Sequence, residues 1–228
     1  MIYFDIETLP TNDESVIAEL RKSITAPAQY KKQDSIDKWM DENAEDQLKE
    51  LIAKTSSDGL YGRIACIAWA MDDGDIMHTK KEMNERECLS MFFDYLDDAF
   101  TMDESLCGHN IAGFDLPFLK HRAIIHNIKP PITLLNAMSA KPWDNVIQDT
   151  MLLWSTDKHR RGSMDRLCKA FGIKGKEGFD GSMVAETWPV NPQKVIDYCC
   201  DDIHRTREIY KRITFQVPRQ ISKRLEAA

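Results

Sequence analysis

The sequence predicts an α/β protein in which helices pack on the faces of a mixed β-sheet. One observation is a pair of apolar, strand-like segments joined by the turn signal Asp72-Asp73-Gly74-Asp75, which indicates a β-hairpin. The other is the alternation of helical and strand-like segments that follows it. A helical stretch at about 14–60 interrupts this order after the first strand. We expect it to be an insertion on the core domain and not a separate domain.

The first half of the chain supplies the expected hairpin and one capped helix. Residues 1–8 are apolar enough to form a buried strand, and 64–71 and 76–79 form the next two strands. Apolar residues spaced three and four apart predict two or three amphipathic helices in the insertion. Asn84 can cap a helix that runs to about Phe100. Its inner face is expected to hold Cys88, Leu89, Phe92, Phe93 and Leu96.

The middle of the chain is less regular. A short strand is expected at 105–109 and a helix at about 115–127. Residues 132–148 show no pattern that favours either a helix or a strand. The segment 149–154 begins a new helix or a short strand.

The C-terminal part is predicted to be helical with one loop. A short helix at 163–171 ends at Gly172, and a glycine-rich, basic loop extends from there to Gly181. Asn191-Pro192 opens the last long helix, which runs to about Phe215.

Composition and charge limit the possible functions. The chain has 228 residues, 43% of them apolar, and no run approaches the length of a membrane span. The N-terminus is not shaped like a signal peptide, and the six cysteines form neither a CxxC pair nor a zinc-ligand spacing. We therefore expect a cytoplasmic protein with reduced, mostly buried thiols. A net charge of −7 argues against a protein that coats nucleic acid non-specifically, but not against a nuclease.

The first strand carries two carboxylates in an otherwise apolar run. Side chains alternate faces in a strand, so Asp5 and Glu7 point the same way while Phe4 and Ile6 point the other way. Burying an acidic pair is costly unless a cation neutralises it. We therefore expect Asp5 and Glu7 to be half of a metal site that later segments complete.

Two later segments carry further acidic signals. Asp115 lies just past the end of an expected strand, which is where open α/β sheets place their active sites. Asn110, in the same segment, is placed to donate to a phosphate or to hold the loop. On the last helix, Tyr198 and Asp202 are four residues apart and share a face.

These motifs together resemble a known family. FDIET at 4–8, NxxxFD from Asn110 to Asp115 and YxxxD from Tyr198 to Asp202 occur in the order found in the tyrosine subclass of the DEDD 3′–5′ exonucleases. The resemblance is to stand-alone proteins related to the proofreading exonuclease domain of family-B DNA polymerases. It covers nearly the whole chain apart from the insertion.

The resemblance implies a fold, a domain organisation and a set of catalytic residues. The fold would be RNase H-like, a five-stranded mixed sheet flanked by helices. Residues 1–228 would form a single exonuclease domain, with a C-terminal helical segment at 192–228 that carries the third motif. Tyr198 would orient or deprotonate the attacking water. The implied metal ligands are Asp5, Glu7, Asp115 and Asp202.

The implied chemistry is hydrolysis of phosphodiester bonds from the 3′ end of DNA, chiefly single strands, with release of nucleoside 5′-monophosphates. A two-metal mechanism suits it, because two ions can serve the attacking and the leaving oxygens. Four carboxylates without a cysteine or histidine ligand favour two Mg²⁺ or Mn²⁺ ions over zinc. The expected partner is a nucleic acid 3′ end, and the sequence identifies no protein partner in replication or repair.

Several residues are candidates for contacts with the nucleic acid. The resemblance implies that Thr8 and Leu9 contact the terminal nucleotide, with Leu9 wedged against the last base. Phe114 is expected either to stack on a base or to be buried. Basic residues that could hold the strand are Lys158, Arg160, Arg161, Arg166, Lys169, Lys174, Lys176, Arg205, Arg207, Lys211 and Arg212.

Other interpretations remain open. The motifs do not separate a DNA exonuclease from a 3′–5′ exoribonuclease of the same superfamily. A non-catalytic nucleic-acid-binding or polymerase-accessory module is a third possibility. Taken alone, Asp115 is more often a helix N-cap and Tyr198 more often helix packing. Asp201 competes with Asp202 as the ligand, although the YxxxD spacing favours Asp202.

Overall fold

The computed structural model describes residues 1–99, 105–140, 144–155, 162–176 and 178–216. Its centre is a five-stranded sheet with the strand order β3-β2-β1-β4-β5. The strands are β1 (Ile2–Leu9), β2 (Arg63–Met71), β3 (Met77–His78), β4 (Leu106–Gly108) and β5 (Ile147–Asp149). The pairs β1–β2 and β2–β3 are antiparallel, whereas β1–β4 and β4–β5 are parallel. The predicted mixed five-stranded sheet is therefore confirmed.

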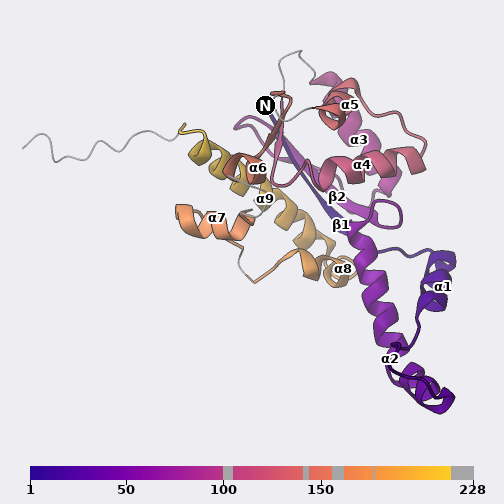
Figure 1. The fold of residues 1–228 in the computed structure, drawn as a ribbon. Helices are drawn as coiled ribbons and strands as arrows, with labels where there is room; N and C mark the ends of the chain where they lie inside the picture. Colours follow the sequence, from indigo (N-terminus) through magenta and orange to yellow (C-terminus); the bar gives the residue numbers. More distant parts are fainter. Residues whose placement is uncertain (100–104, 141–143, 156–161, 177, 217–228) are drawn as a thin grey trace, which may run out of the picture.

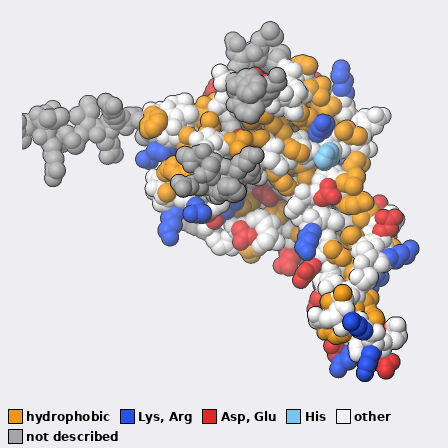
Figure 2. Space-filling view, in the orientation of Figure 1, with side chains coloured by type: hydrophobic (Ala, Val, Ile, Leu, Met, Phe, Trp, Pro, Cys, Tyr) orange, Lys and Arg blue, Asp and Glu red, His pale blue; other side chains and the backbone are white. Residues whose placement is uncertain are grey.

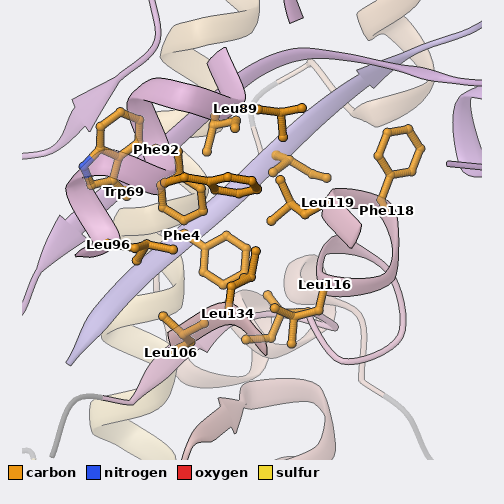
Figure 3. Close-up of a cluster of buried hydrophobic side chains, with 14 of the residues drawn as sticks. Phe4, Trp69, Leu89, Phe92, Leu96, Leu106, Leu116, Phe118, Leu119 and Leu134 are labelled. Carbon is orange, nitrogen blue, oxygen red and sulfur yellow. The ribbon is translucent and has the colours of Figure 1, made fainter. Parts of the chain in front are cut away.

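One face of the sheet packs against three helices. The side chains of Ile2, Phe4 and Ile6 on β1 belong to the largest apolar cluster of the molecule, shown in part in Figure 3. Cluster residues also come from α3 (Glu85–Asp98), α4 (Asp115–Ile125) and α5 (Ile132–Ser139). The five residues predicted for the inner face of the helix after Asn84 are all buried there.

The other face of the sheet packs against α9 (Pro192–Ile213) and α8 (Val184–Thr187). On this face β2 presents small side chains, namely Cys66, Ala68 and Ala70. Small residues let a helix backbone lie close to the strands beneath it. Asp5 and Glu7 point to this face because they alternate with Phe4 and Ile6 along β1. The packing therefore brings α9 over the acidic pair.

The insertion forms an arm that projects from the sheet domain (Figure 1). It consists of α1 (Glu14–Ser23) and α2 (Gln33–Lys54), followed by the short helix η1 (Thr55–Ser57). The two helices pack on each other through a small apolar cluster around Trp39 and Leu48. As predicted, the insertion is helical and has no sheet of its own in the described part of the chain.

Helix ends follow the capping residues in the sequence. Asn84 forms a capping box with Glu87 at the start of α3. Asn191 accepts a hydrogen bond from the backbone N–H of Lys194 at the start of α9. Helix α7 (Met164–Phe171) ends at Gly172, whose φ of 69° is left-handed and suits glycine. These boundaries were predicted within a few residues because the signals are local.

The structure corrects or extends four assignments. The segment 132–148 contains α5 and the start of β5, which its sequence pattern did not reveal. In 149–154, Asp149 ends β5 and caps α6 (Thr150–Trp154). The last helix ends at Ile213, so it does not fill the segment 192–228, of which 217–228 lies outside the described residues. Phe100, the predicted end of α3, also lies outside them.

A buried ion network ties the arm and two helices to the start of β2. Glu85 accepts hydrogen bonds from Arg122 Nε at 2.8 Å and Nη2 at 2.7 Å, and His126 Nε2 lies 2.7 Å from Glu85 Oε2. The backbone N–H of Ile64 donates to Glu85 Oε1 at 2.8 Å. Arg122 Nη1 also reaches the backbone oxygen of Gly59 at 3.3 Å.

Among the described residues, no helix is long and apolar enough to cross a membrane. All six cysteines are free thiols and five of them are buried, which agrees with the expected reduced, mostly buried thiols.

Candidate active site

Three carboxylates converge between β1 and α9. Asp5 and Glu7 come from β1 and Asp202 from α9, and one oxygen of each lies within 4.8 Å of the other two. Glu7 is 9% exposed and Asp202 is 4% exposed. We call these three residues the acidic group. It joins residues almost 200 positions apart in the chain, because α9 lies over the small side chains of β2.

Asp115 lies next to the acidic group. It is the first residue of α4, and its Oδ1 accepts a hydrogen bond from the backbone N–H of Ile6 at 3.2 Å. It is 3% exposed, and burial raises its pKa to about 7. Asp115 therefore lies against the backbone between Asp5 and Glu7, although it is not one of the three carboxylates that meet within 4.8 Å.

The electrostatics of the acidic group resist ionisation in the absence of a cation. Burial raises the pKa of Asp5 well above its ordinary value, and the charges of Asp202 and Asp115 raise it further. Burial, followed by the charge of Asp5, likewise raises the pKa of Glu7. A bound divalent cation reverses both effects. Carboxylate oxygens are also the ligands that Mg²⁺ and Mn²⁺ prefer.

Two cations hold Asp202 in place. Arg205 Nη1 lies 2.5 Å from Asp202 Oδ1, and Lys176 Nζ lies 3.0 Å from Asp202 Oδ2. The sequence indicated both residues only as general basic candidates. The i, i+3 spacing of Asp202 and Arg205 on a helix was a usable signal for their pairing. Lys176 gave no such signal, because it comes from a loop 26 positions before Asp202.

Tyr198 faces the acidic group from the same side of α9 as Asp202. Its hydroxyl contacts Lys176 Nζ, which also lies 4.5 Å from the centre of the tyrosine ring. The ring of Phe179 packs edge-on against it at 5.0 Å. Burial, followed by the charge of Asp202, raises the pKa of the Tyr198 phenol well above its ordinary value. The phenol is therefore protonated and able to donate a hydrogen bond.

Asp149 shapes the loop that leads into Asp115. Its carboxylate accepts hydrogen bonds from the backbone N–H groups of Asn110 at 2.9 Å and Ala112 at 3.0 Å. It also accepts one from Met151 at 2.9 Å, at the start of α6. Asn110 has a φ of 67°, a left-handed conformation that asparagine adopts more readily than most residues. An aspartate directly before a helix is a sequence signal for the cap of α6. No sequence signal indicated that the same carboxylate also binds the loop at Asn110 and Ala112.

The thiol of Cys199 borders the acidic group. Cys199 lies one position after Tyr198, and its thiol Sγ is 3.4 Å from Asp5 Oδ2 and from the backbone oxygen of Asp5. Burial raises the pKa of the Cys199 thiol, so the thiol stays protonated and donates to the carboxylate.

The predicted substrate-contact residues lie in different surroundings. The Thr8 hydroxyl donates to the backbone oxygen of Ser56 at 2.7 Å. Leu9 is 5% exposed and packs in the apolar cluster under α8 and α9, so little of its side chain is open to a base. The Phe114 ring packs on Phe118 at 5.6 Å. Arg160 and Arg161 lie outside the described residues. Substrate contact by these side chains stays a prediction.

Residues 61–223 match the model of a family described as "Predicted 3'-5' exonuclease related to the exonuclease domain of PolB". No curated protein sequence matches this chain. The fold is similar to that of the family B DNA polymerase from the hyperthermophilic archaeon Pyrobaculum calidifontis, with a TM-score of 0.55 and 16% identity, over 93% of this chain and 24% of the polymerase. The chain thus spans about a quarter of that protein.

Proposed function

Because the chain belongs to the family of predicted 3′–5′ exonucleases related to the exonuclease domain of PolB, we propose that it shortens DNA from the 3′ end, chiefly as a single strand. The products are nucleoside 5′-monophosphates. We assign the chain to the tyrosine subclass of the DEDD exonucleases, with residues 1–228 as one exonuclease domain. The observation that carries the proposal is the convergence of the acidic group beside Tyr198.

The acidic group fits two hard divalent cations, Mg²⁺ or Mn²⁺. It offers three carboxylates with oxygens within 4.8 Å of one another. We assign Asp115, which accepts a hydrogen bond from the backbone N–H of Ile6, as the fourth ligand. When bound, such ions activate a water and neutralise charge on the attacking and leaving oxygens of an in-line displacement. Strand β1 fixes Asp5 and Glu7, and Arg205 fixes the Asp202 oxygen that it contacts.

Tyr198 orients the attacking water in this proposal. Its hydroxyl is held by Lys176 and its ring by Phe179, so the phenol has a fixed direction beside Asp202. A protonated phenol can donate to the water or to a phosphate oxygen. This favours an orienting role over the alternative in which Tyr198 deprotonates the water.

The nucleic acid strand is proposed to be held by the following residues. Thr8 and Leu9 follow Glu7 directly, and we propose that they contact the terminal nucleotide, with Leu9 against the last base. Asn110 and Phe114 are proposed to contact the strand from the loop before α4. Arg160 and Arg161 are proposed to bind its phosphates.

A nuclease assay tests the proposal. Purified protein is incubated with a 5′-labelled single-stranded deoxyoligonucleotide in Mg²⁺, in Mn²⁺ and with a chelator. A ladder that shortens from the 3′ end is expected only with metal, and it should be absent in Asp5→Ala and Asp202→Ala. The matched control is Asp201→Ala, whose side chain is 63% exposed and should be dispensable. Cleavage in chelator, or by the Asp5→Ala variant, would contradict the proposal.

The choice between DNA and RNA is tested with matched strands. Only the 2′-OH distinguishes the two substrates at a given sequence. We expect the deoxyribonucleotide strand to be shortened faster. A faster reaction on the ribonucleotide strand would make the protein an exoribonuclease of the same superfamily.

A further inference from the structure

Both carboxylate oxygens of Asp202 are in contact with cations. Arg205 Nη1 lies 2.5 Å from Oδ1, and Lys176 Nζ lies 3.0 Å from Oδ2. The contacts are largely shielded from water, because the side chains of Asp202, Arg205 and Lys176 are 6%, 8% and 17% exposed. A divalent cation that binds Asp202 therefore meets two positive charges at the same carboxylate, where water screens little of the repulsion.

Ion pairs on the arm differ from this arrangement. Acidic and basic side chains are interspersed along the arm (Figure 2), and the pair of Lys49 and Asp46 has side chains that are 75% and 79% exposed. Water and salt screen such charges, so a pair of this kind contributes little to stability. The charge of Lys176 is screened much less, so its effect on another cation at Asp202 is correspondingly larger.

Arg205 is held at Asp202 by several contacts. It lies three residues after Asp202 on α9, so the helix itself keeps the two side chains together. Its Nη2 also reaches the backbone oxygen of Gly175 at 3.3 Å and Asp201 Oδ2 at 3.4 Å. Moving the guanidinium away from Asp202 would break all of these contacts at once.

Lys176 has more freedom to leave. It comes from the loop that follows α7, and a flexible four-carbon stem carries its ammonium. A cavity of about 210 Å³ lies beside it, and Tyr198, Asp197 and Asp201 line this cavity as well. We call this space the side cavity. The ammonium can leave Asp202 for the side cavity without leaving Tyr198, and two other carboxylates are available to it there.

We infer that Lys176 is an internal competitor of the divalent cation: its ammonium neutralises Asp202 until a metal ion binds, and it then moves into the side cavity. The inference rests on the proposed function, because it takes the acidic group as the metal site. Arg205 continues to hold Oδ1, and the release of Oδ2 by Lys176 leaves that oxygen to the metal. Lys176 is thus a determinant of metal affinity.

Binding of Mn²⁺ measures the competition. Isothermal titration calorimetry on the whole chain, without nucleic acid, gives the Kd for wild type, Lys176→Met and Lys176→Arg. The matched control is Lys194→Met, because Lys194 lines the same side cavity with its Nζ 4.8 Å from the centre of the Phe179 ring. This control separates the loss of the contact with Asp202 from the loss of a nearby positive charge.

Lys176→Met should bind Mn²⁺ about tenfold more tightly than wild type, which is about 1.4 kcal/mol. Lys176→Arg keeps the charge and should bind Mn²⁺ no more tightly than wild type. Lys194→Met should leave the Kd within about twofold of the wild-type value, because solvent screens its charge. Unchanged or weaker binding in Lys176→Met, or equal tightening in Lys176→Arg or Lys194→Met, would overturn the inference. If neither wild type nor Lys176→Met binds Mn²⁺, the metal site of the proposed function fails, and the inference fails with it.

A second measurement uses wild-type protein and so does not depend on the folding of a variant. Acetylation of lysines by sulfo-N-hydroxysuccinimide acetate is followed by mass spectrometry, with Mn²⁺ and with chelator. Lys176 should be modified several-fold faster with Mn²⁺, because its amine then lies in the side cavity. Lys194, which is already exposed, should react equally fast in both conditions. Equal rates for Lys176 would mean that the metal does not displace it.

Discussion

Among the buried carboxylates of the described residues, two places have opposite surroundings. Glu85 is a single carboxylate that accepts hydrogen bonds from Arg122, His126 and the backbone of Ile64. The acidic group places three carboxylates together, and among the described residues the ion pairs that reach it are those of Asp202 with Arg205 and Lys176. The pKa of Glu85 is lowered, whereas the pKa values of Asp5 and Glu7 are raised.

The difference separates a carboxylate whose partners lie within the protein from a group of carboxylates that we propose to bind metal ions. A buried charge whose hydrogen bonds are complete stabilises one arrangement of the chain and leaves no room for an added ion. Carboxylates that repel one another gain most from a divalent cation between them. Charge removal should therefore have opposite consequences for stability in the two places.

The largest expected effect is on activity. Asp5→Asn removes the charge of a proposed metal ligand and should lower the proposed exonuclease rate by about 10³-fold, which is about 4 kcal/mol of transition-state stabilisation. The same change relieves repulsion, so the free energy of unfolding of the metal-free protein should rise. Steady-state kinetics and urea unfolding in chelator measure the two quantities. If Asp5→Asn were as active as wild type, or less stable than wild type in chelator, Asp5 would not differ from Glu85 in the way described.

The next effect is on stability alone. Glu85→Gln leaves the Arg122 guanidinium, whose side chain is 8% exposed, without its carboxylate. Breaking one side of a buried pair costs about 3–5 kcal/mol, so the free energy of unfolding should fall by about that amount. Urea unfolding measures it, with Glu82→Gln as the control, because the Glu82 side chain is 69% exposed. A loss no larger than that of the control would show that the network contributes little.

Metal binding should stabilise the folded protein. A ligand that binds only the folded state at a hundred times its Kd adds about 2.7 kcal/mol. For a chain of this size that corresponds to a rise in Tm of about 5–10 °C. Thermal unfolding with Mn²⁺ and with chelator measures the shift, which should be retained in Glu85→Gln and lost in Asp202→Asn. A shift of equal size in Asp202→Asn would place the ion elsewhere.

The smallest expected effect is the pH dependence of the Glu85 network. Burial alone would raise the pKa of Glu85, but hydrogen bonds from Arg122, His126 and the backbone of Ile64 hold it below its ordinary value. Its contribution to stability is therefore complete above the ordinary glutamate pKa and is lost as the pH falls through the lowered value.

Unfolding free energies measured from pH 6 down to pH 3 test whether the contribution of Glu85 to stability is lost as the pH falls. The difference between wild type and Glu85→Gln should shrink toward the acid end of the range. A difference that stays constant with pH would mean that Glu85 does not ionise in the folded protein.

Local signals in the sequence were sufficient for most of the fold. The alternation of Phe4, Asp5, Ile6 and Glu7 predicted which side chains share a face of β1, because the strand period is two. Asn84, Gly172 and Asn191 marked helix ends through their own backbone preferences. The segment 132–148 was not predicted, because α5 is short and β5 has three residues, too few for a periodic pattern.

The sequence by itself determined the ordered motifs that contain Asp5, Glu7, Asp115, Tyr198 and Asp202, and the spacing that puts Tyr198 and Asp202 on one face of α9. Only the tertiary structure decided that Lys176 contacts both of those residues, that Asp149 holds the loop before Asp115, and that the base of the insertion binds Thr8 through Ser56. The physical reason is distance along the chain. Helical and strand periods relate residues a few positions apart, whereas these contacts join separate segments and form only when α9, the loops and the arm pack against the sheet.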